Sequence, residues 1–202
     1  MRNLFIAAAA CAVGLAMAPA ASATVVLSDT FDGEVADDLN WDGDATFFVS
    51  AGFVDLIGAG GAFDFYPGNG SYIDMDGSGG AGADPAGEIT SFANFAAGTY
   101  NLTFELGGNA RGAPARTTRI TLGDFSTEIT LNSGDALTLY DFTFTTTGGQ
   151  LVFRELGPAN FQGNILDDVT LAAIPEPATW AMMILGFGAA GAMIRRRAFA
   201  LA

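Results

Sequence analysis

Apolar and polar residues alternate in short runs between Thr24 and Ile174, and this alternation limits the folds open to the chain. In the run YNLTFEL at 100–106, every second residue is apolar. A period of two places the apolar side chains on one face of a strand. Glycine clusters and Asp-Gly steps, which favour turns, separate roughly nine to eleven such runs. The pattern predicts an all-β fold, an antiparallel β-sandwich of the jelly-roll type.

One run departs from simple alternation. Leu137 and Leu139 share one parity, whereas Tyr140, Phe142 and Phe144 share the other. A slip of one residue moves the following side chains to the opposite face of a strand. We therefore expect a β-bulge or a bend near Leu139.

The stretch 58–87 is rich in glycine and is expected to form long loops around one short strand near Tyr72–Met75. Within it, Asp74 and Asp76 are spaced like the first ligands of an EF-hand loop. Pro85 occupies the twelfth position, where that loop needs an acidic residue. The sequence favours the alternative, an acidic turn held by side-chain-to-backbone hydrogen bonds.

The first 23 residues have the pattern of a secretory signal peptide. Arg2 precedes an apolar run at 4–17, and the small residues Ala21 and Ala23 flank Ser22 at the end. This pattern predicts cleavage after Ala23. Retention as a membrane anchor is the alternative, and the cleavage signal together with Pro19 argues against it.

A second apolar segment follows the alternating region. Pro175, Glu176 and Pro177 stop the last strand, and 178–194 is an uncharged run at the lower limit for a membrane-spanning helix. Trp180 is expected at one membrane interface, with the arginine cluster on the cytoplasmic side. The predicted organisation is a signal peptide (1–23), a β-sandwich (24–174), a tail segment with a transmembrane helix (175–198) and four further residues (199–202).

The order of this tail resembles the PEP-CTERM sorting signal in its PEP-x-x-WA variant. The resemblance covers PEPATWAMMILGFGAAGAMIRRR and is carried by Pro175, Glu176, Pro177, Trp180, Arg195, Arg196 and Arg197. It implies processing by an exosortase-type membrane protease near Pro-Glu-Pro, after transient anchoring in the inner membrane. It also implies a Gram-negative producer with exopolysaccharide or biofilm material. The alternative is a plain C-terminal membrane anchor, and both interpretations place the β-domain outside the inner membrane.

Composition narrows the chemistry of the region 24–174. It contains no lysine or histidine, four arginines and 21 acidic residues, a formal charge of −17. A surface this acidic excludes nucleic-acid binding through phosphates and suits divalent cations. The only cysteine, Cys11, lies in the signal peptide. Disulfides, histidine-ligated zinc and nucleophile–histidine pairs are therefore excluded from the mature domain.

A structural Ca²⁺ is one prediction for the ends of the domain. Asp167 shares the parity of Val169 and Leu171, so its carboxylate should point towards the core and needs a partner or a cation. The first and last strands of a jelly roll can lie together. The predicted ligands are then Asp29, Asp32, Glu34 and Asp167. The alternative is that Asp167 caps backbone amides, and the sequence does not decide between the two.

The segments AGTYNLTFELGGNARG and LDDVTL resemble the galactose-binding-like jelly rolls of carbohydrate-binding modules. This resemblance implies a sandwich with Ca²⁺ near the chain ends, and it carries over no ligand-binding residue. Trp41 and Tyr66 are the aromatic candidates for stacking on a sugar, with coverage of the core as the alternative for both. Arg111, Arg116 and Arg119 suit either acidic sugars or pairing with neighbouring acids.

These features favour a non-catalytic surface protein that associates with exopolysaccharide. The Glu-x-Asp-x-x-Glu motif of many jelly-roll glycosidases is absent from the chain. The first alternative is a structural or adhesive matrix protein without a specific glycan ligand. Ice binding and glycosidase activity are weaker alternatives, because regular Thr-x-Thr repeats are also absent.

Overall fold

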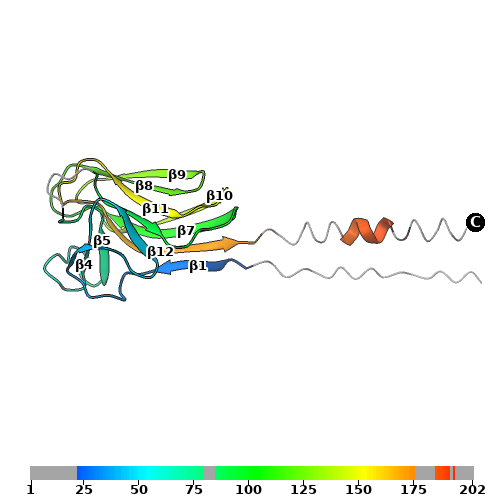
Figure 1. Ribbon diagram of the computed structural model, residues 1–202, viewed down its shortest axis with the longest axis horizontal. Coiled ribbons are helices and arrows are strands. Elements are labelled where there is room, and N and C mark those ends of the chain that lie inside the picture. Colours follow the sequence, from blue (N-terminus) through cyan, green and yellow to red (C-terminus); the bar gives the residue numbers. More distant parts are fainter. Residues whose placement is uncertain (1–21, 80–84, 176–184, 192, 194–202) are drawn as a thin grey trace, which may run out of the picture. The chain divides into compact units, whose positions relative to one another are not determined.

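The structure is a computed structural model that describes residues 22–79, 85–175, 185–191 and 193. Residues Ser22–Pro175 form one compact unit, an all-β antiparallel sandwich (Figure 1). This confirms the predicted fold class. The strands of the described residues are β1 (Thr24–Asp29), β2 (Asp38–Trp41), β3 (Phe47–Ala51), β4 (Val54–Gly58), β5 (Ser71–Asp74), β6 (Glu88–Ser91), β7 (Gly98–Gly107), β8 (Arg116–Leu122), β9 (Phe125–Leu131), β10 (Thr138–Thr146), β11 (Leu151–Leu156) and β12 (Ile165–Ile174).

The strands form two sheets. The larger sheet has the order β10-β7-β12-β5-β4-β2, and β1 also pairs with β12. The smaller sheet has the order β3-β6-β11-β8-β9. The first and last strands are therefore neighbours, as expected for the two ends of the domain. They lie side by side in Figure 1, with Thr24 opposite Ala173.

Local sequence explains the most regular strands. In β7, Tyr100, Leu102, Phe104 and Leu106 are all buried, as their alternation predicts. Strands β8 and β9 are joined by a two-residue turn that begins at Gly123. The φ of Gly123 is 60°, a value that type II′ hairpin turns require at their first position and that glycine adopts without strain.

The core lies between the sheets. Strand β7 contributes Leu102 and Phe104, β8 contributes Ile120, and β11 contributes Phe153, all with no exposed surface. The rings of Phe104 and Phe153 meet edge to face at 5.2 Å between centroids and so connect the two sheets. Fully buried side chains of this size contribute about 1.5–3 kcal/mol each to folding.

A second apolar cluster lies on the opposite face of the larger sheet. Ile57, Tyr72 and Ile165 are buried there, and Phe65, Tyr66 and Leu137 pack against them. The Tyr72 hydroxyl accepts hydrogen bonds from the backbone amides of Phe65 and Tyr66. The predicted long loop after β4 therefore folds back over this face, and the predicted short strand near Tyr72 is β5.

The bulge expected near Leu139 is not present. Strand β10 pairs with β7 in one continuous register from Thr138 to Thr146. Tyr140, Phe142 and Phe144 face the core, whereas Leu139 is 60% exposed. The apparent slip arose because Leu137 precedes the strand and packs in the second cluster instead.

A bulge does occur in β12. Asp167 is opposite Glu105 and Thr170 is opposite Thr103, so one extra residue of β12 lies between them, and Asp168 has a φ of 49°. Leu166, Val169 and Leu171 belong to the core between the sheets, whereas Ile165 belongs to the second cluster. Asp167 is buried as predicted, but it shares the face of Ile165, not that of Val169. The predicted face of Asp167 was wrong because the bulge changes the parity of β12 between Asp167 and Val169.

Most of the predicted signal peptide and much of the predicted tail segment lie outside the described residues. Among the residues outside are Ala21, Glu176, Pro177, Trp180 and the arginine cluster 195–197. Residues 185–191 are helical. Within the described part of the chain, we find no helix with the length and apolar character needed to span a bilayer.

Candidate functional site

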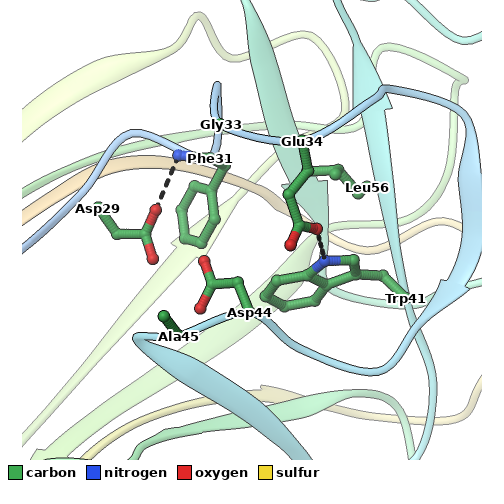
Figure 2. Close-up of a pocket in the computed structure, with 8 residues that line it drawn as sticks. All are labelled: Asp29, Phe31, Gly33, Glu34, Trp41, Asp44, Ala45 and Leu56. Carbon is green, nitrogen blue, oxygen red and sulfur yellow. Dashed lines mark hydrogen bonds between the residues drawn. The ribbon is translucent and has the colours of Figure 1, made fainter.

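A pocket of about 250 Å³ opens beside the end of β1, and it is the candidate site of the domain (Figure 2). Its wall carries carboxylates and its floor carries apolar side chains. The lining residues are Asp29, Phe31, Gly33, Glu34, Trp41, Asp44, Ala45 and Leu56.

Turns position the acidic side of the pocket. Asp29 ends β1, and its Oδ1 accepts a hydrogen bond of 2.9 Å from the backbone amide of Phe31. Asp44 precedes β3, and its Oδ1 accepts bonds from the backbone amides of Thr46 (2.6 Å) and Phe47 (2.8 Å). Both are Asx-type turns, in which an aspartate holds its own loop in place.

The aromatic floor belongs to the core. Phe31 and Trp41 are each 2% exposed, and their rings meet edge to face at 6.2 Å. The indole Nε1 of Trp41 donates a hydrogen bond of 2.6 Å to Glu34 Oε2. Of the two interpretations of Trp41, the structure supports coverage of the core, because almost none of its ring is free for stacking.

Asp29 and Asp44 face each other across the pocket (Figure 2). Asp29 Oδ2 is buried and has no hydrogen-bond partner among the described residues. Burial raises the pKa of Asp29 to about 6, and the neighbouring carboxyl group of Asp44 acts in the same direction. Like charges that face each other repel, so a ligand that donates a hydrogen bond from a hydroxyl group or carries a positive charge would suit this pair.

The four predicted Ca²⁺ ligands do not come together. Asp29 and Glu34 line the pocket. Asp32 instead accepts a 2.7 Å bond from the backbone amide of Ser71. The described residues contain no group of three or more acidic, histidine or cysteine side chains arranged to hold a metal ion.

Asp167 lies near Asp32 instead. It is 1% exposed, and its Oδ2 accepts a 2.6 Å bond from the side-chain amide of Asn69. Its Oδ1 accepts a 2.8 Å bond from the backbone amide of Asp168. Burial raises the pKa of Asp167 to about 8, and the charges of Asp168 and Asp32 act in the same direction. Asp167 therefore caps a backbone amide, as one of its two alternatives predicts. The other alternative, a bound Ca²⁺, stays a prediction, because no cation among the described residues balances the charge of Asp167.

Tyr66 anchors a loop. It is partly buried, and its hydroxyl donates to the backbone carbonyls of Gly108 (2.6 Å) and Asp135 (2.9 Å). Its ring meets Tyr72 edge to face at 5.9 Å. Burial raises the pKa of its hydroxyl, and the charge of Asp135 adds to this effect. Through these contacts Tyr66 connects the loop after β4 to the end of β7.

The arginines Arg111, Arg116 and Arg119 pair with neighbouring acidic side chains, which was one of their two interpretations. Arg111 forms an ion pair with Asp74, and Arg119 pairs with Glu128 at 2.7 Å. Arg116 is buried between Asp76 (2.8 Å) and Glu155 (3.3 Å). Glu155 was not identified from the sequence, where it is one more alternating residue of a strand. The inward parity that it shares with Leu151 and Phe153 is the signal that identifies it.

The acidic segment 74–78 is a turn. Asp74 Oδ1 accepts a 3.1 Å bond from the backbone amide of Asp76 and a 2.9 Å bond from that of Gly163. Ser78 donates from its backbone amide and its hydroxyl to Asp55. Burial raises the pKa of Asp74 to about 7, against the lowering effect of Arg111. The sequence favoured this turn over an EF-hand loop.

The tail matches a known family model over residues 173–197, described as the PEP-CTERM protein-sorting motif. The chain carries a PEP-CTERM sorting motif. The matched segment begins inside β12, which ends at Ile174, so no linker separates the motif from the sandwich. The PEP-CTERM motif indicates an exported protein that exosortase sorts to the cell surface.

Several solved structures are similar to the chain. The CBM22-1 xylan-binding domain of Paenibacillus barcinonensis Xyn10C has a TM-score of 0.47 at 12% identity, over 79% of this chain and 99% of that domain. The K3 cleaved adhesin domain of Lys-gingipain from Porphyromonas gingivalis has a TM-score of 0.44 at 15% identity, over 74% and 100%. A family 35 carbohydrate-binding module from Clostridium thermocellum has a TM-score of 0.36 at 14% identity, over 62% and 90%. No curated protein matches the chain.

Proposed function

We propose that this protein is exported, sorted through its PEP-CTERM motif and displayed as a sugar-binding β-sandwich that associates with exopolysaccharide. The sorting half of the proposal rests on the motif at 173–197. An exosortase-type protease is the proposed processing partner, and a Gram-negative envelope or its matrix is the proposed location.

The sugar-binding half rests on the pocket beside β1. A pyranose ring offers hydroxyl donors around an apolar face of C–H groups. The pocket offers acceptors for such donors, in the carboxylates of Asp29, Glu34 and Asp44 that line it. Its volume of about 250 Å³ suits a single sugar residue at the end or bend of a polymer.

A glycan array with the processed protein tests this half. We expect binding to at least one bacterial polysaccharide, lost in the double variant Asp29→Asn, Asp44→Asn. Asp124→Asn is the matched control, because Asp124 is an exposed turn aspartate outside the pocket. Absence of binding to every polysaccharide would favour the structural matrix role instead, and binding by the double variant equal to that of Asp124→Asn would exclude the pocket as the sugar site.

Pulse-chase labelling in the producing cell tests the sorting half. Replacement of Pro175, Glu176 and Pro177 by alanines should abolish processing and surface display. Unchanged processing would leave a plain membrane anchor as the better account of the tail.

A structural Ca²⁺ near Asp167 is a further part of the proposal. Asp167 is a buried carboxylate without a neighbouring cation among the described residues, and Asp32 and Asn69 bring more oxygen atoms to the same loop. Ca²⁺ takes six to eight oxygen ligands, so backbone carbonyls and water would complete the set. Asp29 and Glu34 fit this ion less well, since they line the pocket. A melting temperature unchanged by a chelator would count against the ion.

A further inference from the structure

Charged side chains are unevenly distributed over the sandwich. One end of it is built from 22–28, 45–50, 90–101, 120–127, 142–153 and 169–175, and we call this end the exit pole. Within these segments Asp124 is the one charged residue, although the region 24–174 has a formal charge of −17. The exit pole is therefore nearly neutral in a strongly acidic domain.

Strand pairing brings these segments together. At the end of β12, Ala173 pairs with Thr24, and Ile174 pairs with Thr99. The next strand pair joins Gly98 to Thr146 at the end of β10. The exit pole is thus the end of the sheet at which the chain begins β1 and leaves β12.

Turns of the smaller sheet complete the exit pole. The Thr146 hydroxyl donates to the carbonyl of Leu122 at 2.6 Å, next to the β8–β9 turn. The backbone amide of Phe92 donates to the carbonyl of Thr46 at 2.9 Å. A depression of about 210 Å³ lies there, and residues from both sides of the sandwich line it: Val26, Leu27, Ser28, Ala45, Thr46 and Ala93.

Large apolar side chains are exposed on the exit pole. Val25 is 59% exposed, Val26 is 42% exposed and Phe92 is 58% exposed. The Phe92 ring packs on Phe48 at 4.9 Å between centroids, which holds it at the surface. Exposed apolar side chains grouped on an uncharged surface mark an interaction site.

We infer that the exit pole contacts the surface of the lipid bilayer while the sorting segment is inserted in the membrane. The inference rests on the proposed sorting. Strand β12 ends at Ile174 and the apolar run begins at 178, and three intervening residues span at most about 11 Å. The chain is too short there to hold the sandwich away from the headgroups.

Charge explains why this end suits a bilayer. Anionic phospholipids give the membrane a negative surface potential, which repels carboxylates within a Debye length of about 8–10 Å. Within its segments the exit pole has no carboxylate except that of Asp124; Asp29 and Asp44 adjoin these segments at the inner edge, and Glu176 follows in the connection to the apolar run. Val25, Val26 and Phe92 are of the types that enter the apolar side of the interface.

Depth-dependent fluorescence quenching tests the inference on the full chain. The protein is inserted into vesicles of phosphatidylethanolamine and phosphatidylglycerol that contain nitroxide-labelled lipid. Cys11→Ser removes the only cysteine, and an environment-sensitive dye is attached through Phe92→Cys on the exit pole or Gly134→Cys in the turn before β10. Gly134 has space for a side chain and lies at the opposite end of β10 from Thr146.

We expect the dye at 92 to be quenched at least twofold more than the dye at 134. Val26→Glu should reduce quenching at 92 to the level at 134. Leu139→Glu is the matched control, because Leu139 is 60% exposed at the far end of β10, and it should change nothing.

Equal quenching at 92 and 134 would overturn the inference. So would a dye at 92 that is shielded from water but not quenched by lipid, because a second copy or another protein would then cover the exit pole. A third dye at Gly188→Cys reports tail insertion separately. If it is not quenched, membrane insertion itself fails, and the proposed sorting fails with it.

Discussion

Replacing Arg116 by methionine should destabilise the domain more than any other single change of an arginine. Arg116 is 5% exposed, and it contacts Asp76 at 2.8 Å, Glu155 at 3.3 Å and the carbonyl of Pro158 at 2.8 Å. A methionine side chain would fill much of the same space, so the main loss is the positive charge between two buried carboxyl groups. Breaking a buried ion pair by removing one partner costs about 3–5 kcal/mol.

The structure places the expected loss at the lower end of that range, at about 3 kcal/mol. Asp76 retains the backbone amide of Asn160 at 2.7 Å, and Glu155 retains the Thr118 hydroxyl at 2.8 Å. Urea unfolding at pH 7, followed by far-ultraviolet circular dichroism, measures the change. Arg119→Met is the matched control, because both partners of its pair with Glu128 are more than 40% exposed. Exposed pairs contribute about 0–1 kcal/mol.

The loss should also depend on pH. Burial raises the pKa of Glu155 to about 8 despite the charge of Arg116. Acidification protonates a buried carboxyl group, and a neutral group has less need of a cation. The destabilisation caused by Arg116→Met should therefore shrink between pH 8 and pH 5. A loss no larger than that of Arg119→Met, or one that grows as the pH falls, would refute this reasoning.

Three further changes test other parts of the fold. Burial raises the folded-state pKa of Asp167 to about 8, so the folded domain loses stability as the pH rises towards 8 and the buried carboxyl group ionises. Asp167→Asn should therefore flatten the dependence of the unfolding free energy on pH by up to about 1.4 kcal/mol per pH unit between 6 and 8. The same change should abolish any Ca²⁺-dependent rise in melting temperature. Tyr66→Phe should cost about 1–3 kcal/mol in urea unfolding, because two carbonyls lose their shared donor. Gly70→Ala should cost about 1–2 kcal/mol, because φ is 78° and the added Cβ would contact the Asp32 carboxylate; a thermal melt equal to wild type would contradict it.

Periodicity predicted the parts of the fold that depend on continuous strands. The run 100–106 alternates without interruption, and all four of its apolar residues face the core as β7. Alternation of apolar and polar residues does not show where a bulge lies, since one extra residue leaves the composition of a strand nearly unchanged. For that reason the parity of Asp167 predicted its burial but not the face on which it lies.

The second apolar cluster was also beyond the reach of periodicity. Strand β5 is buried on both faces because the loop after β4 covers one of them. No local pattern tells that a glycine-rich loop will fold back onto its own sheet. The same loop carries Tyr66, and its sequence did not indicate that the Tyr66 hydroxyl would donate to two backbone carbonyls.

The many aspartates of the chain were the hardest residues to interpret from sequence, and their common role explains why. A domain with four arginines and no lysine cannot pair 21 acidic side chains with cations. Neutral side chains and backbone amides are the remaining donors, and loops leave many backbone amides without a partner inside a strand. At least one backbone amide donates a hydrogen bond to each of seven aspartates: Asp29, Asp32, Asp44, Asp55, Asp74, Asp76 and Asp167.

An aspartate that holds a loop through backbone hydrogen bonds and one that binds a cation occupy the same kind of turn, so sequence spacing favours neither role. What separates them is the number of donors that reach each carboxylate. One carboxylate oxygen of Asp29 accepts no hydrogen bond from the described residues. A ligand in the pocket beside β1 that donates a hydrogen bond to this oxygen would therefore stabilise the fold.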